Sequence, residues 1–410
     1  MIQTDVLGKL ISAPSIVSLT STLRVRRCVV ADAVPPAARP ALIAALALRS
    51  GEPLLVVVPR QNHADDLAYA IAQLLPEFPV ISWQAPETLP YDIFTQDRSL
   101  AADRTWFLAQ LRNATSGVFI VPARGLTQLL PRPATVDARS LTLKVGRELR
   151  PMLLLEFLTE SGYAAAPLVQ HPASFSRRGG IIDFWPPGSE AAIRVEFFGD
   201  EIEAIRRFDP ATQRTTDRLE TITVLPISDV PISTYRLAAA KLRELDTRSL
   251  RPEVLAEWTR LLDRLERGEL VPPPEFVLPF LLSDAATILD YHAPDRPVVI
   301  LDPGAVQLAL EQFERQAEEF RDTSELSGEL PRGLPRPYHA SALILRALAD
   351  RPVLWLGATS EPSGCSAESS DLGGECAGWA DAADAGAHFA GAAGGGPGDC
   401  GVFEQSGHDG

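Results

Sequence analysis

The sequence is poor in lysine. Only Lys9, Lys144 and Lys241 stand among its 38 basic residues, so arginine carries almost all of the positive charge. A P-loop, which binds nucleotide phosphates, needs the pattern G-x-x-x-x-G-K-[ST]. The single Gly-Lys pair, Gly8-Lys9, is followed by leucine and has no glycine at the required spacing before it. The chain therefore contains no P-loop.

Other signatures of specialised chemistry are missing as well. No apolar run reaches the 18 residues of a membrane span, and Asp5 and Lys9 interrupt any N-terminal signal sequence. The four cysteines form no CxxC pair or Cys/His metal spacing, and the six histidines belong to no HExxH motif. We therefore expect a cytoplasmic protein without catalytic residues, metal, cofactor or membrane partner.

Positive charge is absent from the last 50 residues. Residues 361–410 contain no Lys or Arg, nine acidic residues and 13 of the 28 glycines. The first 360 residues consequently hold 38 basic against 44 acidic groups, so they account for −6 of the net charge of −15. Such a balance gives no strongly basic nucleic-acid footprint. The composition of 361–410 predicts a disordered tail.

The rest of the chain alternates between apolar strands and amphipathic helices. The run 52–59, apolar at every position after Glu52, is typical of a buried parallel strand, and helical spacing follows it at 62–75. This alternation predicts a doubly wound, parallel-sheet α/β scaffold. We expect residues 1–130 and 227–350 to form this scaffold, with a small α+β domain at 131–226 inserted. Residues 351–410 are expected to begin a further domain, which then passes into the tail.

The segment 175–215 predicts a meander of short strands. Runs at 193–198 and 201–208 flank Gly199-Asp200, a short-hairpin signature. Alternation puts Ile193, Val195 and Phe197 on the core face, and Arg194 and Phe198 on the polar face. An aromatic beside an arginine is enriched at interface hot spots. The alternative is that a neighbouring strand covers Phe198 and that Arg194 is a solvated edge charge.

Two motifs in this segment resemble a known docking domain. RRGGIIDFWPPGS (177–189) and RVEFFGDEIEAIRRFDP (194–210) resemble the UvrA-docking domain shared by UvrB and the transcription-repair coupling factors (Mfd). ETLPYD (87–92), followed by Arg104 and Leu108, resembles the N-terminal module of the coupling factors. The resemblance covers roughly residues 10–345. It implies a UvrB-like scaffold, truncated here before the polymerase-interacting and translocase domains.

The resemblance also implies partners and site residues. Arg178, Arg194 and Phe198 match the positions that contact UvrA in the family, whose C-terminal domain masks this surface in the resting protein. Full-length members are ATP-dependent DNA translocases that also bind RNA polymerase and double-stranded DNA. Without the masking domain, this chain should bind UvrA constitutively.

The nucleotide site of a UvrB-like scaffold is degenerate in this sequence. The stretch 29–39, where UvrB has its P-loop, contains no Gly or Lys, two prolines and Asp32, which would repel phosphate. After the apolar run 297–301, the acidic pair of a DExH motif is reduced to Asp302-Pro303. Asp302 is better explained as a helix cap or turn residue than as a metal ligand.

We therefore interpret the chain as a non-enzymatic adaptor that recruits UvrA. Each arginine could take a carboxylate of UvrA with two parallel hydrogen bonds, and truncating either should leave folding intact. Two alternatives remain open. One is a UvrB-type, nucleotide-dependent repair enzyme. The other is a nucleic-acid-binding module built on Arg177, Arg178, Arg206 and Arg207.

Overall fold

A parallel six-stranded sheet forms the centre of the larger part of the molecule. The computed structural model describes residues 2–25, 28–31, 34–86, 88–92 and 98–357. The strand order is β1-β14-β13-β2-β4-β3, with every neighbouring pair parallel. In this order the strands are β1 (Cys28–Ala31), β14 (Val353–Leu356), β13 (Val298–Leu301), β2 (Pro53–Val58), β4 (Gly117–Pro122) and β3 (Val80–Ser82).

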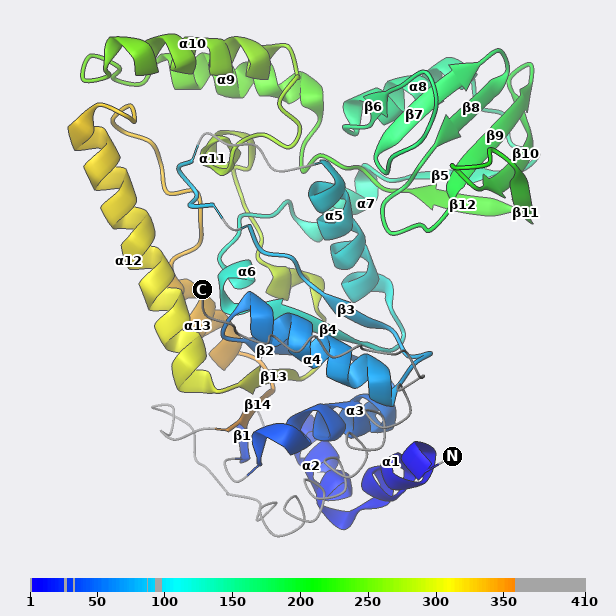
Figure 1. The fold of residues 1–410 in the computed structure, drawn as a ribbon, viewed down its shortest axis with the longest axis vertical. Coiled ribbons are helices and arrows are strands. Elements are labelled where there is room, and N and C mark those ends of the chain that lie inside the picture. The colour runs from blue at the N-terminus through cyan, green and yellow to red at the C-terminus, as the bar shows by residue number, and fades with distance from the viewer. Residues whose placement is uncertain (1, 26–27, 32–33, 87, 93–97, 358–410) are drawn as a thin grey trace, which may run out of the picture.

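Helices cover both faces of this sheet (Figure 1). Strand β2 explains why, since every one of its residues is buried. Leu54 and Val56 point to one apolar core, and Leu55 and Val57 to the other. The first core is closed by α1 (Ile2–Ser12), α2 (Pro14–Val25), α3 (Arg39–Ser50) and α4 (Gln61–Leu74). The second is closed by α5 (Arg98–Asn113), α6 (Ala123–Leu126), α12 (Pro303–Ser327) and α13 (Ser341–Ala349).

A second sheet lies apart from the first, at the upper right of Figure 1. Its order is β11-β10-β9-β8-β7-β6, antiparallel except for the short parallel pair β6–β7. The strands are β6 (Ala164–Ala165), β7 (Ser174–Arg178), β8 (Ile181–Phe184), β9 (Ala192–Phe198), β10 (Glu201–Phe208) and β11 (Thr215–Leu219). Helix α8 (Pro151–Glu160) packs Leu154 and Leu158 on its inner face. The strands β5 (Leu141–Lys144) and β12 (Thr221–Val224) pair beside it.

Helices follow the second sheet before the chain returns to the first. They are α9 (Tyr235–Arg243), α10 (Pro252–Glu266) and α11 (Leu278–Leu281). The short helix α7 (Pro133–Ala138) comes earlier in the chain, before the second sheet begins. Short 3₁₀ turns lie at Pro36–Ala38, Ile232–Thr234, Glu275–Val277 and Ile288–Tyr291. In the core of this helical part, Trp258 stacks on Phe276 with 5.6 Å between ring centroids. Tyr91, from the loop that carries the LPYD motif, is buried in the same cluster.

The architecture confirms the predicted fold class, an α/β scaffold with a small domain inserted into it, and differs from our expectations in two places. We expected the strand near residue 353 to open a further domain. It instead lies inside the scaffold sheet, between β1 and β13. The helices α1 and α2 were also not predicted. Residues 361–410, which we expected to be disordered, lie outside the described part of the chain.

Candidate functional site

Two tight hairpins place the candidate site at one end of the second sheet. Gly179-Gly180 joins β7 to β8, and Gly199-Asp200 joins β9 to β10. Two-residue loops of the II′ type need a glycine at their first position. Gly179 and Gly199 meet this need with φ angles of 63° and 61°. The loops lie close together, because a Cβ on Gly180 would be 3.0 Å from the carbonyl oxygen of Phe197.

The outer face of this sheet carries most of its charge. We call the set Arg178, Asp183, Arg194, Glu196, Phe198 and Arg206 the arginine face. Along β9 the burial alternates as the sequence predicted: Ile193 and Val195 are buried in the core, and the polar residues between them are only partly buried. Pairing of β8 and β10 with β9 puts Asp183 and Arg206 directly opposite Arg194.

Asp183 is the centre of the arginine face. Its side chain is only 2% exposed, yet both carboxylate oxygens have cationic partners. Arg194 donates from Nε to Oδ1 at 2.8 Å and from Nη2 to Oδ2 at 2.9 Å, a two-point contact. Arg178 donates from Nη2 to Oδ2 at 2.8 Å. A carboxylate this deeply buried is tolerated only with such partners.

Arg194 is fixed from a second side by an aromatic ring. Its Cζ lies 4.7 Å from the ring centroid of Phe208, which is fully buried. Hydrogen bonding to Asp183 raises the pKa of the Arg194 guanidinium above its already high value, so the group stays charged at any physiological pH. With 15% of the side chain exposed, Arg194 is largely an internal residue.

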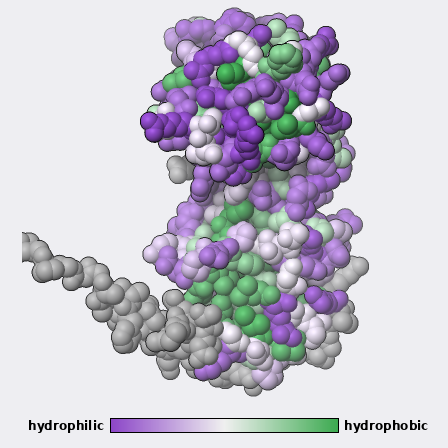
Figure 2. Space-filling view, turned by 90° about the vertical axis from the view of Figure 1, so that its right-hand side faces the viewer, coloured by the Kyte–Doolittle hydropathy of each residue, from purple (hydrophilic) through white to green (hydrophobic). Residues whose placement is uncertain are grey.

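Arg178 and Phe198 are the accessible members of the arginine face. Half of the Arg178 side chain is exposed (51%), and only one of its nitrogens binds Asp183. Phe198, the last residue of β9, is 78% exposed, so no neighbouring strand covers it. The inserted domain presents mainly hydrophilic residues on the side shown in Figure 2, and a large exposed aromatic stands out against such a surface.

These contacts correct part of the reasoning from sequence. We expected Arg194 to be free to bind a carboxylate of a partner, and its truncation to leave folding intact. Its guanidinium group instead donates two hydrogen bonds to the carboxylate of Asp183. Sequence reasoning missed Asp183, which stood inside an apolar run. An acidic residue in a strand that is otherwise apolar, flanked in the sequence by strands that carry arginines, was the available signal.

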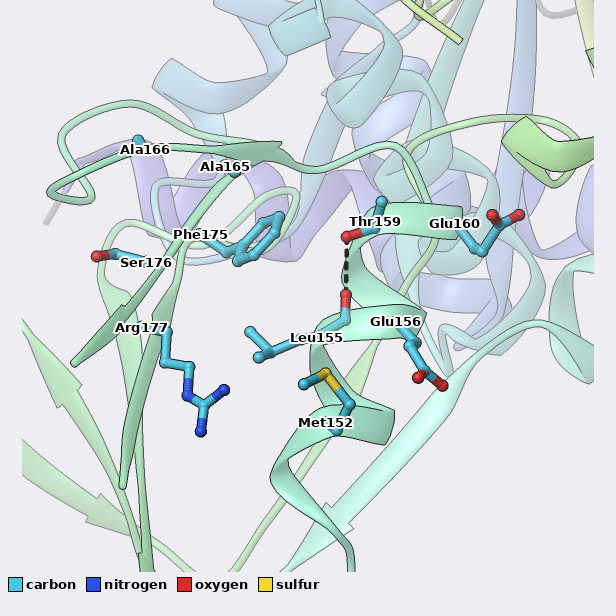
Figure 3. A pocket seen from close by; sticks show the side chains of 10 residues that line it. All are labelled: Met152, Leu155, Glu156, Thr159, Glu160, Ala165, Ala166, Phe175, Ser176 and Arg177. Carbon is cyan, nitrogen blue, oxygen red and sulfur yellow. Dashed lines mark hydrogen bonds between the residues drawn. The ribbon is translucent and has the colours of Figure 1, made fainter. Parts of the chain in front are cut away.

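A groove of the inserted domain lies on the other side of β7. It has a volume of about 420 Å³ and runs between α8 and the strands β6 and β7 (Figure 3). Met152, Leu155 and Phe175 supply apolar lining, and Arg177 borders it. Since Arg177 alternates with Arg178 along β7, the groove is separate from the arginine face.

An ion pair lies where the sequence led us to expect a degenerate nucleotide site. Asp302 follows β13 and occupies the N-cap position of α12 with a φ of 48°, but its side chain caps no backbone N–H. Its Oδ2 instead accepts from Nη1 of Arg39 at 2.7 Å, at the start of α3. The segment before α3 is a 3₁₀ turn, Pro36–Ala38, which contains neither glycine nor lysine. These are the residue types with which a P-loop binds phosphate. Asp32, our other candidate here, lies outside the described residues.

Two further classes of site are absent from the described ranges. No group of three or more His, Cys, Asp or Glu side chains there could hold a metal ion. No helix in that part of the chain is both long enough and apolar enough to cross a bilayer.

Comparison with known proteins places these features in a family. Residues 141–229 match the UvrB interaction domain. Similar proteins include the transcription-repair-coupling factors of Haemophilus influenzae (30% identical over 58% of this chain and 20% of the relative), Escherichia coli (28%, over 67% and 23%) and Bacillus subtilis (26%, over 69% and 25%). The chain thus spans about a fifth to a quarter of their length. It carries a UvrB interaction domain and corresponds to the N-terminal region of a transcription-repair coupling factor.

Proposed function

We propose that this chain is an adaptor that binds UvrA through the arginine face. The UvrB interaction domain and the related coupling factors support a role in transcription-coupled repair. The observation that carries the finer proposal is Phe198, which is exposed at the hairpin end of the matched domain, on the same face of the sheet as the half-exposed Arg178. An exposed large aromatic and an arginine on one surface are the composition of an interface hot spot.

The arrangement indicates what UvrA should offer in return. Phe198 needs an apolar socket, because its burial would then remove apolar surface from water. Arg178 has free N–H groups that suit a carboxylate. We propose that Arg178 and Phe198 make the direct contacts, and that Arg194 contributes mainly from within the sheet. UvrA would thus present an acidic residue next to an apolar pocket.

The proposal is tested by a calorimetric titration of the whole chain with UvrA. We expect saturable binding with one site per chain and an affinity that falls as salt rises, because an arginine–carboxylate contact at an interface is screened by salt. Reversing the charge with Arg178→Glu should abolish most of this binding. Unchanged binding by that variant would show that UvrA, if it binds at all, uses another surface.

We propose further that the chain carries out no nucleotide chemistry. In support, the Arg39–Asp302 ion pair uses the one carboxylate left at the end of β13 and neutralises the nearby cation. A nucleotide that bound only the folded chain would raise its stability by mass action. We expect millimolar ATP with Mg²⁺ to leave the thermal midpoint unchanged and no phosphate to be released. An ATP-dependent rise that disappears in Asp302→Ala would favour the UvrB-type enzyme instead.

The second alternative, a nucleic-acid-binding module, is less well supported. Two of its four arginines already have carboxylate partners within the sheet: Arg178 pairs with Asp183, and Arg206 with Glu196 at 3.0 Å. Arg177 lies on the opposite side of β7, beside the groove in Figure 3. Arginines that are paired with carboxylates, or that lie on opposite sides of the sheet, do not form one continuous positive surface for phosphates.

The remaining assignments follow from the same interpretation. We propose that residues 131–226 form the docking domain and that 1–130 and 227–357 form the scaffold. We also propose that the protein to which the region belongs works in the cytoplasm, where it meets RNA polymerase and double-stranded DNA through parts other than the arginine face.

A further inference from the structure

A buried carboxylate holds the exposed arginine of the proposed docking site. Asp183 is almost completely inaccessible, so a protein partner cannot touch it. Its Oδ2 nevertheless accepts a hydrogen bond at 2.8 Å from Nη2 of Arg178, half of whose side chain is exposed. A residue that is itself hidden can therefore influence a residue at the surface.

The register of the sheet explains why Asp183 has this position. Asp183 lies on β8 between Ser176 of β7 and Arg194 of β9. Arg194 fixes the carboxylate by the two-point contact and is itself fixed on the ring of Phe208. The carboxylate is thus held rigidly before Arg178 reaches it, and can orient Arg178.

Arg178 has no direct cross-strand partner that could replace Asp183. The residue opposite it on β8 is Ile181, which has no hydrogen-bonding side chain. One strand further lies Glu196, whose Oε1 already accepts from Nε of Arg206 at 3.0 Å. Among the contacts of Arg178 in the sheet, the hydrogen bond to Asp183 is the one that selects an orientation of its guanidinium.

We propose that Asp183 is a positioning residue of the docking site: it orders Arg178 for the partner's carboxylate without contacting the partner. This inference rests on the proposed function. Immobilising a long side chain at an interface has an entropic cost, which is smaller when the free protein already holds that side chain in place. The negative charge of Asp183 also partly neutralises the arginine face, which weakens its attraction for a carboxylate. For Asp183 to favour binding, the benefit of holding Arg178 in place must exceed this loss of attraction.

The test is a double-mutant cycle, measured by calorimetric titration of UvrA into the whole chain. The variants are Asp183→Asn, Arg178→Ala and Phe198→Ala, together with the two doubles that contain Asp183→Asn. Asp183→Asn alone should weaken UvrA binding about three- to tenfold, the range expected for one additional immobilised side chain. It should have less than a twofold effect once Arg178 is alanine, and its full effect in the Phe198→Ala background.

The controls separate positioning from general damage to the fold. Arg177→Ala removes an arginine from the same strand on the opposite side and should bind as the parent chain does. Circular dichroism reports whether each variant is folded. Should Asp183→Asn be unfolded, Asp183→Glu replaces it, because this variant retains the charge but displaces the oxygen that holds Arg178. It should then bind more weakly than the parent while the Arg178→Ala background removes the difference.

The possible outcomes are distinct. An Asp183→Asn effect of the same size with and without Arg178 would show that the residue acts through the fold, and would overturn the inference. Unchanged or tighter binding by Asp183→Asn would overturn it as well. Parent-like binding by both Arg178→Ala and Phe198→Ala would contradict the docking face itself, which is the proposed function.

Discussion

Phe198→Ala is expected to weaken binding to UvrA by roughly 30-fold or more, which corresponds to about 2 kcal/mol. The aromatic ring is 78% exposed in the free chain and makes few contacts that folding needs. Its apolar surface can therefore be buried only when a partner covers it. For the same reason, the thermal midpoint of the variant should stay within a degree or two of that of the parent.

The chain offers a matched control for this variant. Tyr69 on α4 is also a highly exposed aromatic, at 70%, but lies on the scaffold rather than the inserted domain. Tyr69→Ala should bind UvrA like the parent. Equal affinities for Phe198→Ala, Tyr69→Ala and the parent would show that Phe198 is a surface residue without a partner. Loss of folding in Phe198→Ala would contradict its exposed position.

Arg194→Ala is expected to destabilise the inserted domain by about 3 kcal/mol. Removing one partner of a buried ion pair generally costs about 3–5 kcal/mol, because a charge is left uncompensated. Here Arg178 remains beside Asp183, so we expect the lower end of this range. The variant also loses the stacking of the guanidinium on Phe208. Amide hydrogen exchange along β8 and β9 measures the change locally, without assuming that the whole chain unfolds in one step.

Arg206→Ala is the control for this effect. Arg206 lies on the same face and pairs with Glu196, but both side chains are about a quarter to a third exposed. Pairs with such access to water contribute about 0–1 kcal/mol, so exchange protection should change little. Equal protection in Arg194→Ala and Arg206→Ala would contradict the internal role of Arg194. If Arg194→Ala is destabilised, its weaker binding to UvrA cannot by itself identify Arg194 as a contact.

The sequence predicted the scaffold because its strands are buried on both faces. A run such as Pro53–Val58 is apolar at every position, which leaves little ambiguity. The helices α1 and α2 gave a weaker signal, since serine and threonine interrupt their apolar spacing. The partner of Val353–Leu356 could not be predicted either, because strand order depends on contacts between distant segments.

The exposed half of the candidate site was easier to predict than the buried half. Period-two alternation gives the facing of Phe198 directly, and the Gly199-Asp200 turn fixes its register. The partner of Arg194 depends on which strand lies beside β9 and in which register. Neither can be derived from the spacing of residues along one strand, so the role of Asp183 required the assembled sheet.

The position of β14 has a consequence for the order in which the chain can assemble on the ribosome. Cys28 of β1 pairs with Val353, about 325 positions later, and among the described strands β14 is the only neighbour of β1. The inserted domain pairs only segments between residues 141 and 224, so it can complete its sheet long before the scaffold does. During synthesis, the docking surface would exist before the domain that carries it. Strand β1 is made well before β14 and would therefore wait for its partner until late in synthesis.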